Sequence, residues 1–421
     1  MSLTSYQTAP PRDEIYRNHC LYNLKTIYMP EIILVNGGRG ANTILPFLIK
    51  KFKITSIVNA YDDGKSTGEI RKYFNILGPS DLRKVHYSML EKKNKDYIFL
   101  KNLFDYRLPV MDNSEIIEEL YNFIKKNNKK NIFSLFIKTK YLNFIKKKMT
   151  IFLKNLKMIK KFQFSDCSVM NCIYTGAFLK NKKDINLGIT EIKKIFSIKN
   201  DVMVNSKEER YLAAIRDNGK ILYSEAEIVE MRSNIRIKKI FLLKKKLKVN
   251  SLNHLSKNKK INFLEKRHTD ISIDRNLVKK IEKTKLIIFC PGTQHSSLYP
   301  TYMTKGFTDL IIENKNIKKL LIVNIGTDYE TPKYKASDYI KNALKYLFIN
   351  SKYKIHKNNF FDLILLNKPK NKVIPNYVLL DKNNLKEFKS KIIIKDFEDK
   401  NATGRHDYKK INKYINLLLN G

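Results

Sequence analysis

One stretch near the amino terminus most constrains what this chain can fold into. An apolar run over 32–35 leads into the glycine turn 37–40, and a second apolar run over 54–58 leads into Asp62 and Asp63. Apolar runs that end in glycine-rich or acidic turns are typical of parallel strands joined by helices, which bind nucleotides at the carboxyl ends of the strands. The order therefore predicts a phosphate-binding turn and a pair of carboxylates at the same edge of one sheet.

The length and composition indicate a folded protein with a large core. The chain has 421 residues, of which 43% are hydrophobic, a content that argues against disorder. No apolar run reaches the roughly 18 residues that span a membrane. The polar start of the chain also lacks the apolar core of a secretion signal. We therefore expect a cytoplasmic protein.

The net charge of +42, from 82 Lys and Arg against 40 Asp and Glu, would suit a nucleic acid or an acidic membrane surface. No aromatic RNA-binding motif or zinc finger accompanies this charge. The chain is also rich in Asn, Ile and Tyr and poor in Gly and Pro, a bias typical of AT-rich coding. We interpret the charge as compositional drift, and we expect neither nucleic acid nor a membrane as the partner.

We predict an α/β fold with a Rossmann-like, doubly wound and mostly parallel sheet. Residues 1–30 form a polar amino-terminal arm, and 31–421 form the nucleotide-binding domain, with a Lys-rich helical insertion at about 111–163. Further strands are expected at 237–243, 286–289, 320–325, 363–366 and 392–394, and helices at 41–51, 81–91, 300–313, 337–347 and 409–419. The turn Asp217-Asn218-Gly219 between two short apolar runs predicts a hairpin.

The Lys-rich insertion contains an amphipathic helix. Residues 121–161 hold thirteen Lys and no Asp or Glu, and apolar residues recur at three- and four-residue steps from Leu142 to Ile159. Such a helix can lie on an anionic membrane. It can also pack its apolar stripe on a core while its lysines face water, and we favour this second interpretation.

The glycine turn and the acidic loop are the first candidate site residues. Glycines at 37–40 let backbone N–H groups approach a phosphate at a helix start, although a tight turn without a ligand has the same pattern. Asp62 and Asp63 can hold Mg²⁺ together with substrate phosphates, or one of them can accept a proton from a hydroxyl. They can equally form an Asx turn and a helix cap. Arg71 and Arg83 can bind a phosphate or pair with a neighbouring acid.

A second candidate loop, 291–297, follows the predicted strand at 286–289. It is rich in small hydrogen-bonding residues, and loops after parallel strands are where ligands bind. His295 is a candidate phosphate donor or acid–base group. The alternative for His295 is a structural role in the core.

Together these motifs resemble the family of 2-phospho-L-lactate transferases and related gluconeogenesis factors, the CofD-like family. The likeness runs from about residue 31 to 410 and leaves out only the leader and the Lys-rich segment. The matching stretches follow the family order: Gly37–Gly40, Ala60–Arg71, Pro79–Arg83, Leu103–Arg107, Ser168–Asn171, Pro291–Pro300, Tyr334–Asp338 and Arg405–Asp407. Four positions depart from the family pattern, because Arg39 replaces Thr while Lys65, Ser80 and Met170 replace Gly.

The resemblance implies a pocket for a nucleoside diphosphate. One branch of the family transfers a phospholactyl-type group from a guanosine-diphosphate-linked donor to a deazaflavin hydroxyl with Mg²⁺, and another branch binds UDP-sugars without settled catalysis. For this chain the resemblance implies catalytic roles for Asp62, Asp63, Arg71 and Arg83, with Mg²⁺ on Asp62 and Asp63, and nucleotide binding by Gly37, Gly38, Arg39, Gly40, Lys65, Ser66, Asp81, Asn171, Gly292, Thr293 and His295. We expect a transferase and a homo-oligomer, with a regulatory UDP-sugar-binding protein as the alternative. The base, the transferred group and the acceptor stay open.

Overall fold

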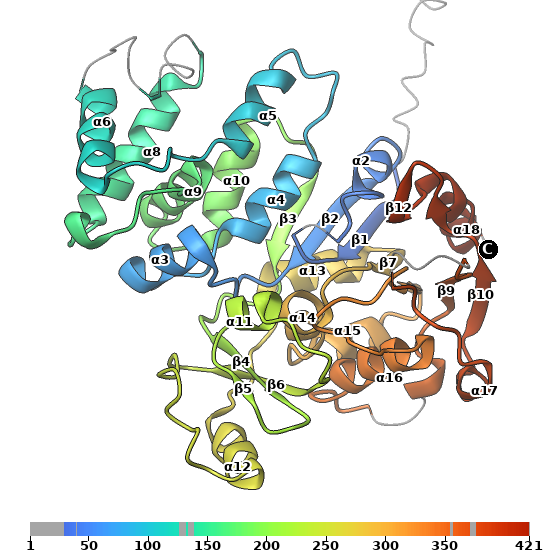
Figure 1. Cartoon of the computed structure of the whole chain (residues 1–421). Coiled ribbons are helices and arrows are strands. Elements are labelled where there is room, and N and C mark those ends of the chain that lie inside the picture. Colours follow the sequence, from blue (N-terminus) through green and yellow to red (C-terminus); the bar gives the residue numbers. More distant parts are fainter. Residues whose placement is uncertain are drawn as a thin grey trace, which may run out of the picture.

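A parallel seven-stranded sheet forms the centre of the molecule (Figure 1). The computed structural model describes residues 29–38, 40–125, 132–133, 139–353, 357–370 and 376–420. The strands lie in the order β10-β9-β8-β7-β1-β2-β3, and every neighbouring pair is parallel. They are β1 Glu31–Val35, β2 Lys53–Val58, β3 Asp201–Val204, β7 Leu286–Phe289, β8 Lys318–Ile322, β9 Leu363–Asn367 and β10 Lys391–Lys395. The predicted α/β fold is confirmed.

The order of the strands reverses between β1 and β7. From β1 the chain proceeds through β2 to β3 at one edge, and from β7 it proceeds through β8 and β9 to β10 at the other edge. Ile32, Leu34 and Ile288 are fully buried here because helices cover both faces of a parallel sheet. In doubly wound sheets a crevice opens at such a switch point, outside the carboxyl ends of the two central strands.

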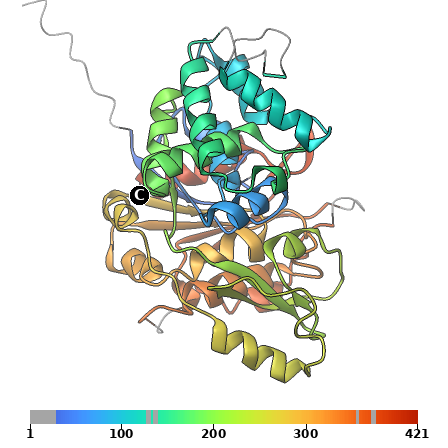
Figure 2. The same cartoon turned by 90° about the vertical axis from the view of Figure 1, so that its left-hand side faces the viewer.

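Helices occupy the chain between β2 and β3 and gather on one side of the molecule (Figure 2). They are α3 Lys65–Phe74, α4 Ser80–Ser88, α5 Tyr97–Asp105, α6 Asn113–Lys125, α8 Leu142–Asn155, the 3-10 turn η1 Ile159–Lys161, α9 Val169–Lys180 and α10 Ile185–Ile195. The predicted insertion at 111–163 covers only α6, α8 and η1 of this layer. The predicted arm at 1–30 lies outside the described residues except for Met29 and Pro30.

The Lys-rich helix α8 packs inward. Ile145, Met149 and Phe152 are completely buried, and α8 packs along α9. Lys148 is also buried, and its ammonium donates a hydrogen bond to Glu191 at 2.6 Å. Because the apolar stripe of α8 lies inside the protein, it is not available to a membrane surface. Within the described ranges, no helix is long and apolar enough to cross a bilayer.

A small antiparallel sheet follows β3. It consists of β4 Tyr211–Arg216, β5 Ile221–Leu222 and β6 Ile237–Leu243 in the order β5-β4-β6. The predicted hairpin is confirmed, with Gly219 at a φ of +82° in its turn. Between β5 and β6 lies α11 Glu225–Glu230, and after β6 comes α12 Lys257–Arg267, which projects on the side opposite the helical layer (Figure 2).

Two predicted helices are wrong in extent. The helix expected at 41–51 is only α2 Leu45–Leu48, because Pro46 has no N–H to donate and is tolerated only in a first helical turn. The helix expected at 300–313 is divided, because Gly306 adopts a φ of +86°. Its parts are α14 Tyr299–Tyr302 and α15 Phe307–Glu313, and the π-helical turn η2 Gln294–Leu298 precedes them. The remaining elements are α13 Arg275–Lys283, α16 Ala336–Leu347, η3 Lys357–Asn359, α17 Lys382–Leu385, β11 Glu398–Asp399, β12 Ala402–His406 and α18 Tyr408–Asn420.

Candidate functional site

A cavity of about 690 Å³ opens at the switch point of the sheet. Three loops line it, the turn after β1 with Gly37 and Gly40, the loop after β2 with Asp62, and the loop after β7 with Gly292 and Thr293. The three loops that the sequence singles out therefore converge on one hollow. Its volume lies in the range of pockets that hold small molecules and cofactors.

The glycines of the turn after β1 allow the loops to pack directly against one another. A methyl group on Gly37 would overlap Ser297, one on Gly38 would overlap Asp81, and one on Gly40 would overlap the carbonyl oxygen of Pro291. Close approach of two backbones is one of the uses of glycine. Arg39, the fourth residue of this turn, lies outside the described residues.

Three helices begin at this cavity. The first residues of α3 and α4 and the third residue of α9 are among its lining residues. None of the three has a side chain that caps its amino terminus. The first N–H groups of a helix lack partners within the helix and carry a partial positive charge. Helix amino termini of this kind form anion sites.

Arg83 is held beside these helix starts. Its Nε donates to Oδ1 of Asn171 at 3.0 Å, and its Nη1 donates to the carbonyl oxygen of Phe104 at 2.6 Å. Asn171 in turn donates from Nδ2 to Oγ of Ser66 at 3.1 Å. The structure therefore brings together Arg83, Asn171 and Ser66, which the sequence analysis assigned to one site from three separate motifs.

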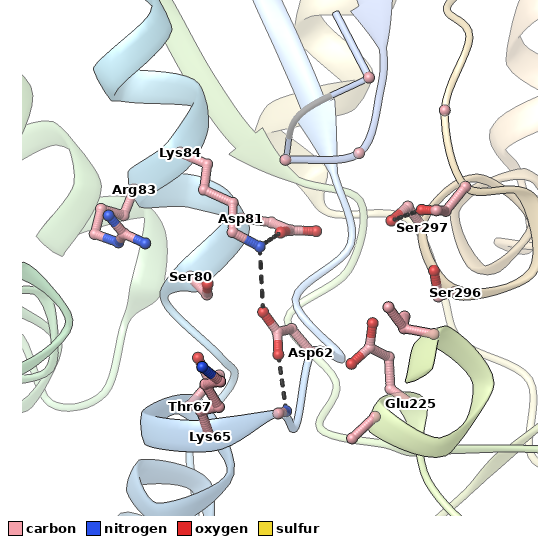
Figure 3. A pocket seen from close by; sticks show the side chains of 18 of the residues that line it. Asp62, Lys65, Thr67, Ser80, Asp81, Arg83, Lys84, Glu225, Ser296 and Ser297 are labelled. Carbon is pink, nitrogen blue, oxygen red and sulfur yellow. Dashed lines mark hydrogen bonds and ion pairs between the residues drawn. The ribbon is translucent and has the colours of Figure 1, made fainter. Parts of the chain in front are cut away.

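Asp62, Lys84 and Asp81 form a chain of charges across the cavity (Figure 3). Lys84 Nζ lies 2.8 Å from Asp81 Oδ1 and 3.7 Å from Asp62 Oδ2. The other oxygen of Asp62 accepts a hydrogen bond from the N–H of Gly64 at 2.9 Å. Burial raises the pKa of Asp62 above its ordinary value, Asp81 raises it further, and Lys84 offsets part of this shift. The Asp62 carboxyl is therefore closer to neutrality than an exposed aspartate.

Asp63 corrects one prediction, because it does not share a site with Asp62. It is buried outside the cavity lining, and its Oδ1 accepts a hydrogen bond from the backbone N–H of Ala226 at 3.0 Å. Its Oδ2 lies 3.3 Å from Nζ of Lys246. Successive side chains of an extended segment point in opposite directions, so the two neighbours face different partners. Asp63 is a structural residue here.

Arg71 also lies away from the cavity. The residue is 1% exposed. Its guanidinium donates from Nη1 to the carbonyl oxygen of Tyr61 at 2.8 Å and lies 4.7 Å from the ring centre of Tyr211. These contacts hold the loop after β2 from behind, so the predicted contact of Arg71 with a phosphate is not supported.

His295 is likewise buried outside the cavity lining. Its ring lies against Tyr299 and Tyr334. Burial, together with the charges of Lys345 and Arg216, lowers the pKa of His295 to about 3. The imidazole is neutral at physiological pH, and the predicted contact of His295 with a phosphate is not supported.

Glu330 holds the loop that contains His295. Its Oε2 accepts hydrogen bonds from the N–H groups of His295 at 2.7 Å and Ser296 at 3.0 Å, and its Oε1 accepts one from Oγ of Ser296 at 2.6 Å. Burial and then the neighbouring Asp328 raise the pKa of Glu330 to about 8. Glu330 therefore fixes the wall that Ser296 and Ser297 contribute to the cavity, from behind that wall.

The predicted Mg²⁺ pair does not match this arrangement. Within the described ranges, no group of three or more His, Cys, Asp and Glu residues is arranged to hold a metal ion. Mg²⁺ is often held by one or two carboxylates plus the phosphates of a ligand. Asp62, which lines the cavity, fits such a role, whereas Asp63 does not.

Several lining residues were missed from the sequence. Lys84 directly follows Arg83, and Arg107 ends the motif Leu103–Arg107, so the position of both in or next to a motif could have identified them. Lys65 and Arg107 lie 3.3 Å and 2.8 Å from the carboxylate of Asp166. Glu225, at the start of α11, had no signal because it follows the hairpin in a stretch without a motif.

A smaller cavity of about 340 Å³ adjoins the main one. Gly40, Gly292 and Asn324 line both, and Asn324 exchanges hydrogen bonds with the backbone of Gly292 at 2.9 Å and 3.0 Å. Arg405, which is exposed, lines the smaller cavity. The two hollows therefore lie next to each other at the glycine turns.

Comparison with known proteins agrees with these motifs. A model of the family described as 2-phospho-L-lactate transferase CofD matches residues 32–400. A Halalkalibacterium halodurans protein named gluconeogenesis factor is 23% identical over 360 residues, covering 84% of this chain and 85% of that protein. A Listeria monocytogenes gluconeogenesis factor is 40% identical over 82 residues, covering 19% of this chain and 24% of that protein. A crystal structure of a Bacillus halodurans protein is similar in fold, with a TM-score of 0.64 at 20% identity, and covers 92% of this chain and 99% of that one. Because the family match extends over most of its length, this chain belongs to the CofD family.

Proposed function

We propose that this protein binds a nucleoside-diphosphate-linked small molecule in the main cavity, as a protein of the gluconeogenesis-factor type. The observation that carries the proposal is the convergence of three uncapped helix amino termini on one hollow at the switch point of the sheet. Each such terminus stabilises an anion by about 0.3–1 kcal/mol when exposed and up to about 2 kcal/mol when partly buried. A diphosphate is negatively charged, so the partial positive charges of these helix amino termini favour its binding.

The cations of the cavity support the same ligand. Lys65, Arg83, Lys84 and Arg107 are among its lining residues. Guanidinium groups bind phosphate oxygens through two parallel hydrogen bonds. The diphosphate would lie at these residues, and the nucleoside would extend along the glycine turns toward the smaller cavity. The names of the relatives support the gluconeogenesis-factor type, because that is what they are called.

Ligand-dependent stability tests this proposal. The unfolding temperature would be measured with UDP, GDP, UDP-glucose and GDP-mannose, each with and without Mg²⁺, and with inorganic phosphate as the comparison. A ligand at 100 times its dissociation constant adds roughly 2.7 kcal/mol to the free energy of unfolding. We expect at least one nucleoside diphosphate to raise the unfolding temperature more than inorganic phosphate does. No stabilisation by any of them at millimolar concentration would refute the proposal.

A second candidate function is the transfer reaction of the family. Asp62 favours it, because a carboxylate with a raised pKa in a cavity is suited to accept a proton. In this reaction the oxygen of an acceptor hydroxyl would bond to the distal phosphorus of the donor, the bond to the nucleoside monophosphate would break, and Asp62 would take the hydroxyl proton. Mg²⁺ would supply charge neutralisation on the diphosphate.

Product formation distinguishes transfer from binding alone. A guanosine-diphosphate-linked lactate donor would be incubated with a deazaflavin acceptor, and release of nucleoside monophosphate would be followed by chromatography. The transfer function predicts release that depends on the acceptor and is lost in Asp62→Asn, with an unchanged unfolding temperature. Binding of the donor without release of nucleoside monophosphate would contradict the transfer function and support the regulatory one.

A further inference from the structure

Glu225 presents a carboxylate to the main cavity without a cation beside it. It lies at the first position of α11 and is one of the lining residues. Among the described residues, no ion pair of Glu225 is present, and its one hydrogen bond is a long one of 3.4 Å from the N–H of Asp63. Figure 3 shows Glu225 on the other side of Asp62 from Arg83. We call the wall with Arg83 and Lys84 the cationic wall, although it also contains Asp81. We call the wall at α11, with Glu225 and Glu230, the acidic wall.

The backbone that carries Glu225 is fixed by several hydrogen bonds. Ser224 caps α11 by accepting from the N–H of Glu227 at 3.2 Å, and Glu227 accepts from the N–H of Tyr223 at 2.9 Å. Asp63 accepts from the N–H of Ala226 at 3.0 Å. Each of these contacts lies within two residues of Glu225. The backbone at Glu225 is thus fixed before a ligand binds, which lowers the cost of recognition.

The charges around Glu225 restrict what can lie against it. Burial, followed by the charges of Asp62 and Asp81, raises the pKa of Glu225 well above its ordinary value. A phosphate or carboxylate group placed here would face carboxyl oxygens and would find no cation to offset its loss of hydration. A neutral group with hydroxyl donors would instead satisfy the carboxyl oxygens.

From this geometry we infer that Glu225 is a specificity-determining residue, which accepts a hydrogen bond from a hydroxyl of the group linked to the diphosphate and rejects an anionic group there. The inference rests on the proposed function, because it places the diphosphate at the cationic wall. It favours a sugar, with neutral hydroxyls, over a lactate, whose carboxylate would face the acidic wall. Asp63 acts as a positioning residue for Glu225 through α11.

The test compares ligands that differ only in the linked group. Dissociation constants would be measured by calorimetry for UDP, UDP-glucose and UDP-glucuronate, and for GDP and GDP-mannose, with the wild-type protein, Glu225→Gln and Glu118→Gln. Glu118 is exposed on α6, so its variant makes the same charge change away from the cavity. Unfolding temperatures would verify that all three proteins are folded.

The expected result is a change in selectivity rather than in overall affinity. Wild-type protein should bind a nucleotide sugar more tightly than the bare nucleotide, and UDP-glucuronate more weakly than UDP-glucose. Glu225→Gln should weaken nucleotide-sugar binding roughly tenfold, because the amide nitrogen of Gln donates where a carboxyl oxygen of Glu225 accepts, so that one acceptor for the linked hydroxyls is lost. The dissociation constants of UDP and GDP should stay within about threefold of their wild-type values. The difference in affinity between UDP-glucose and UDP-glucuronate should become smaller. Glu118→Gln should match the wild type.

Two different outcomes would overturn the inference. If Glu225→Gln weakens the binding of the bare nucleotide and of the nucleotide sugar by the same factor, or changes neither affinity, Glu225 does not contact the linked group. If wild-type protein binds none of these nucleotides, the proposed function itself fails, and that result is distinguishable because it does not depend on any variant.

Discussion

Asp63 accepts a hydrogen bond from the backbone N–H of Ala226 at 3.0 Å, so the loop after β2 holds the amino terminus of α11. Its second carboxylate oxygen lies 3.3 Å from Nζ of Lys246, in the segment that follows β6. One buried side chain thus joins three segments that are distant in sequence. The residue that the sequence suggested as a metal ligand is a structural link between two walls of the cavity.

Removal of this carboxylate should lower stability. We expect Asp63→Ala to reduce the free energy of unfolding by about 1–2 kcal/mol, because α11 loses a hydrogen bond at its amino terminus. Asp63→Asn keeps an acceptor oxygen for the N–H of Ala226, so its free energy of unfolding should decrease less than that of Asp63→Ala. Urea denaturation followed by circular dichroism measures both. Equal losses in the two variants would assign the effect to the charge rather than to the hydrogen bond.

Two glycines of the cavity should respond differently to a methyl group. Gly40→Ala forces the new carbon against the carbonyl oxygen of Pro291 and should cost roughly 1–3 kcal/mol. Gly64→Ala places it 3.6 Å from Oδ1 of Asp62 and 4.0 Å from Cβ of Ala226, which are ordinary van der Waals distances, and should change stability by less than about 1 kcal/mol. Thermal unfolding of both variants provides the comparison. A Gly40→Ala protein as stable as the wild type would contradict direct packing of the two loops.

The carboxyl of Glu330 should make stability depend on pH. Its folded pKa of about 8 lies above the ordinary value of 4.5, so the folded protein keeps a proton that the unfolded chain has lost. This contribution to stability is complete below about pH 4.5 and decreases as the pH rises toward 8, by up to about 1.4 kcal/mol per pH unit.

Glu330→Gln removes this titration while retaining an acceptor for the N–H groups of His295 and Ser296. Between pH 5 and 8 the stability of the variant should fall less steeply than that of the wild type. Denaturation curves at several pH values measure the slope. Parallel slopes in the two proteins would show that Glu330 does not titrate in this range.

The guanidinium of Arg83 should matter for ligand binding beyond its charge. Arg83→Lys keeps the charge but replaces the two nitrogens that donate to Asn171 and to the carbonyl of Phe104 by a single one without the planar geometry. We expect nucleoside-diphosphate binding to weaken by about tenfold, corresponding to roughly 1.4 kcal/mol. Arg267→Lys on the exposed surface of α12 is the matched control and should bind as the wild type does. Calorimetric titration with UDP or GDP measures the difference.

Much of the fold was predictable because buried parallel strands appear in the sequence as short apolar runs. The strands at 32–35, 54–58 and 286–289 were found within one residue of their observed bounds. The convergence of their loops followed from the rule that ligands bind at the carboxyl ends of such strands. The helix at 300–313 failed because the conformation of Gly306 depends on its tertiary contacts.

Site residues were predictable from the sequence only where the position of their loops on the sheet is enough to bring them together. Asn171 and Arg83 come together because motif order places the starts of α4 and α9 at one edge. The direction of a side chain within a loop does not follow from its position, and this is why Asp62 lines the cavity and Asp63 does not. Glu225 was missed because α11 reaches the cavity from the small antiparallel sheet, a contact between segments separated by more than 150 residues.

The two walls of the cavity are therefore encoded in separate stretches of the chain. The cationic wall comes from the residues between β1 and β3, and the acidic wall includes α11, which lies between β5 and β6. On the proposed assignment, substitutions in α11 would alter which linked group is accepted and would leave the phosphate-binding residues unchanged. A change of ligand would then need substitutions in only one short helix.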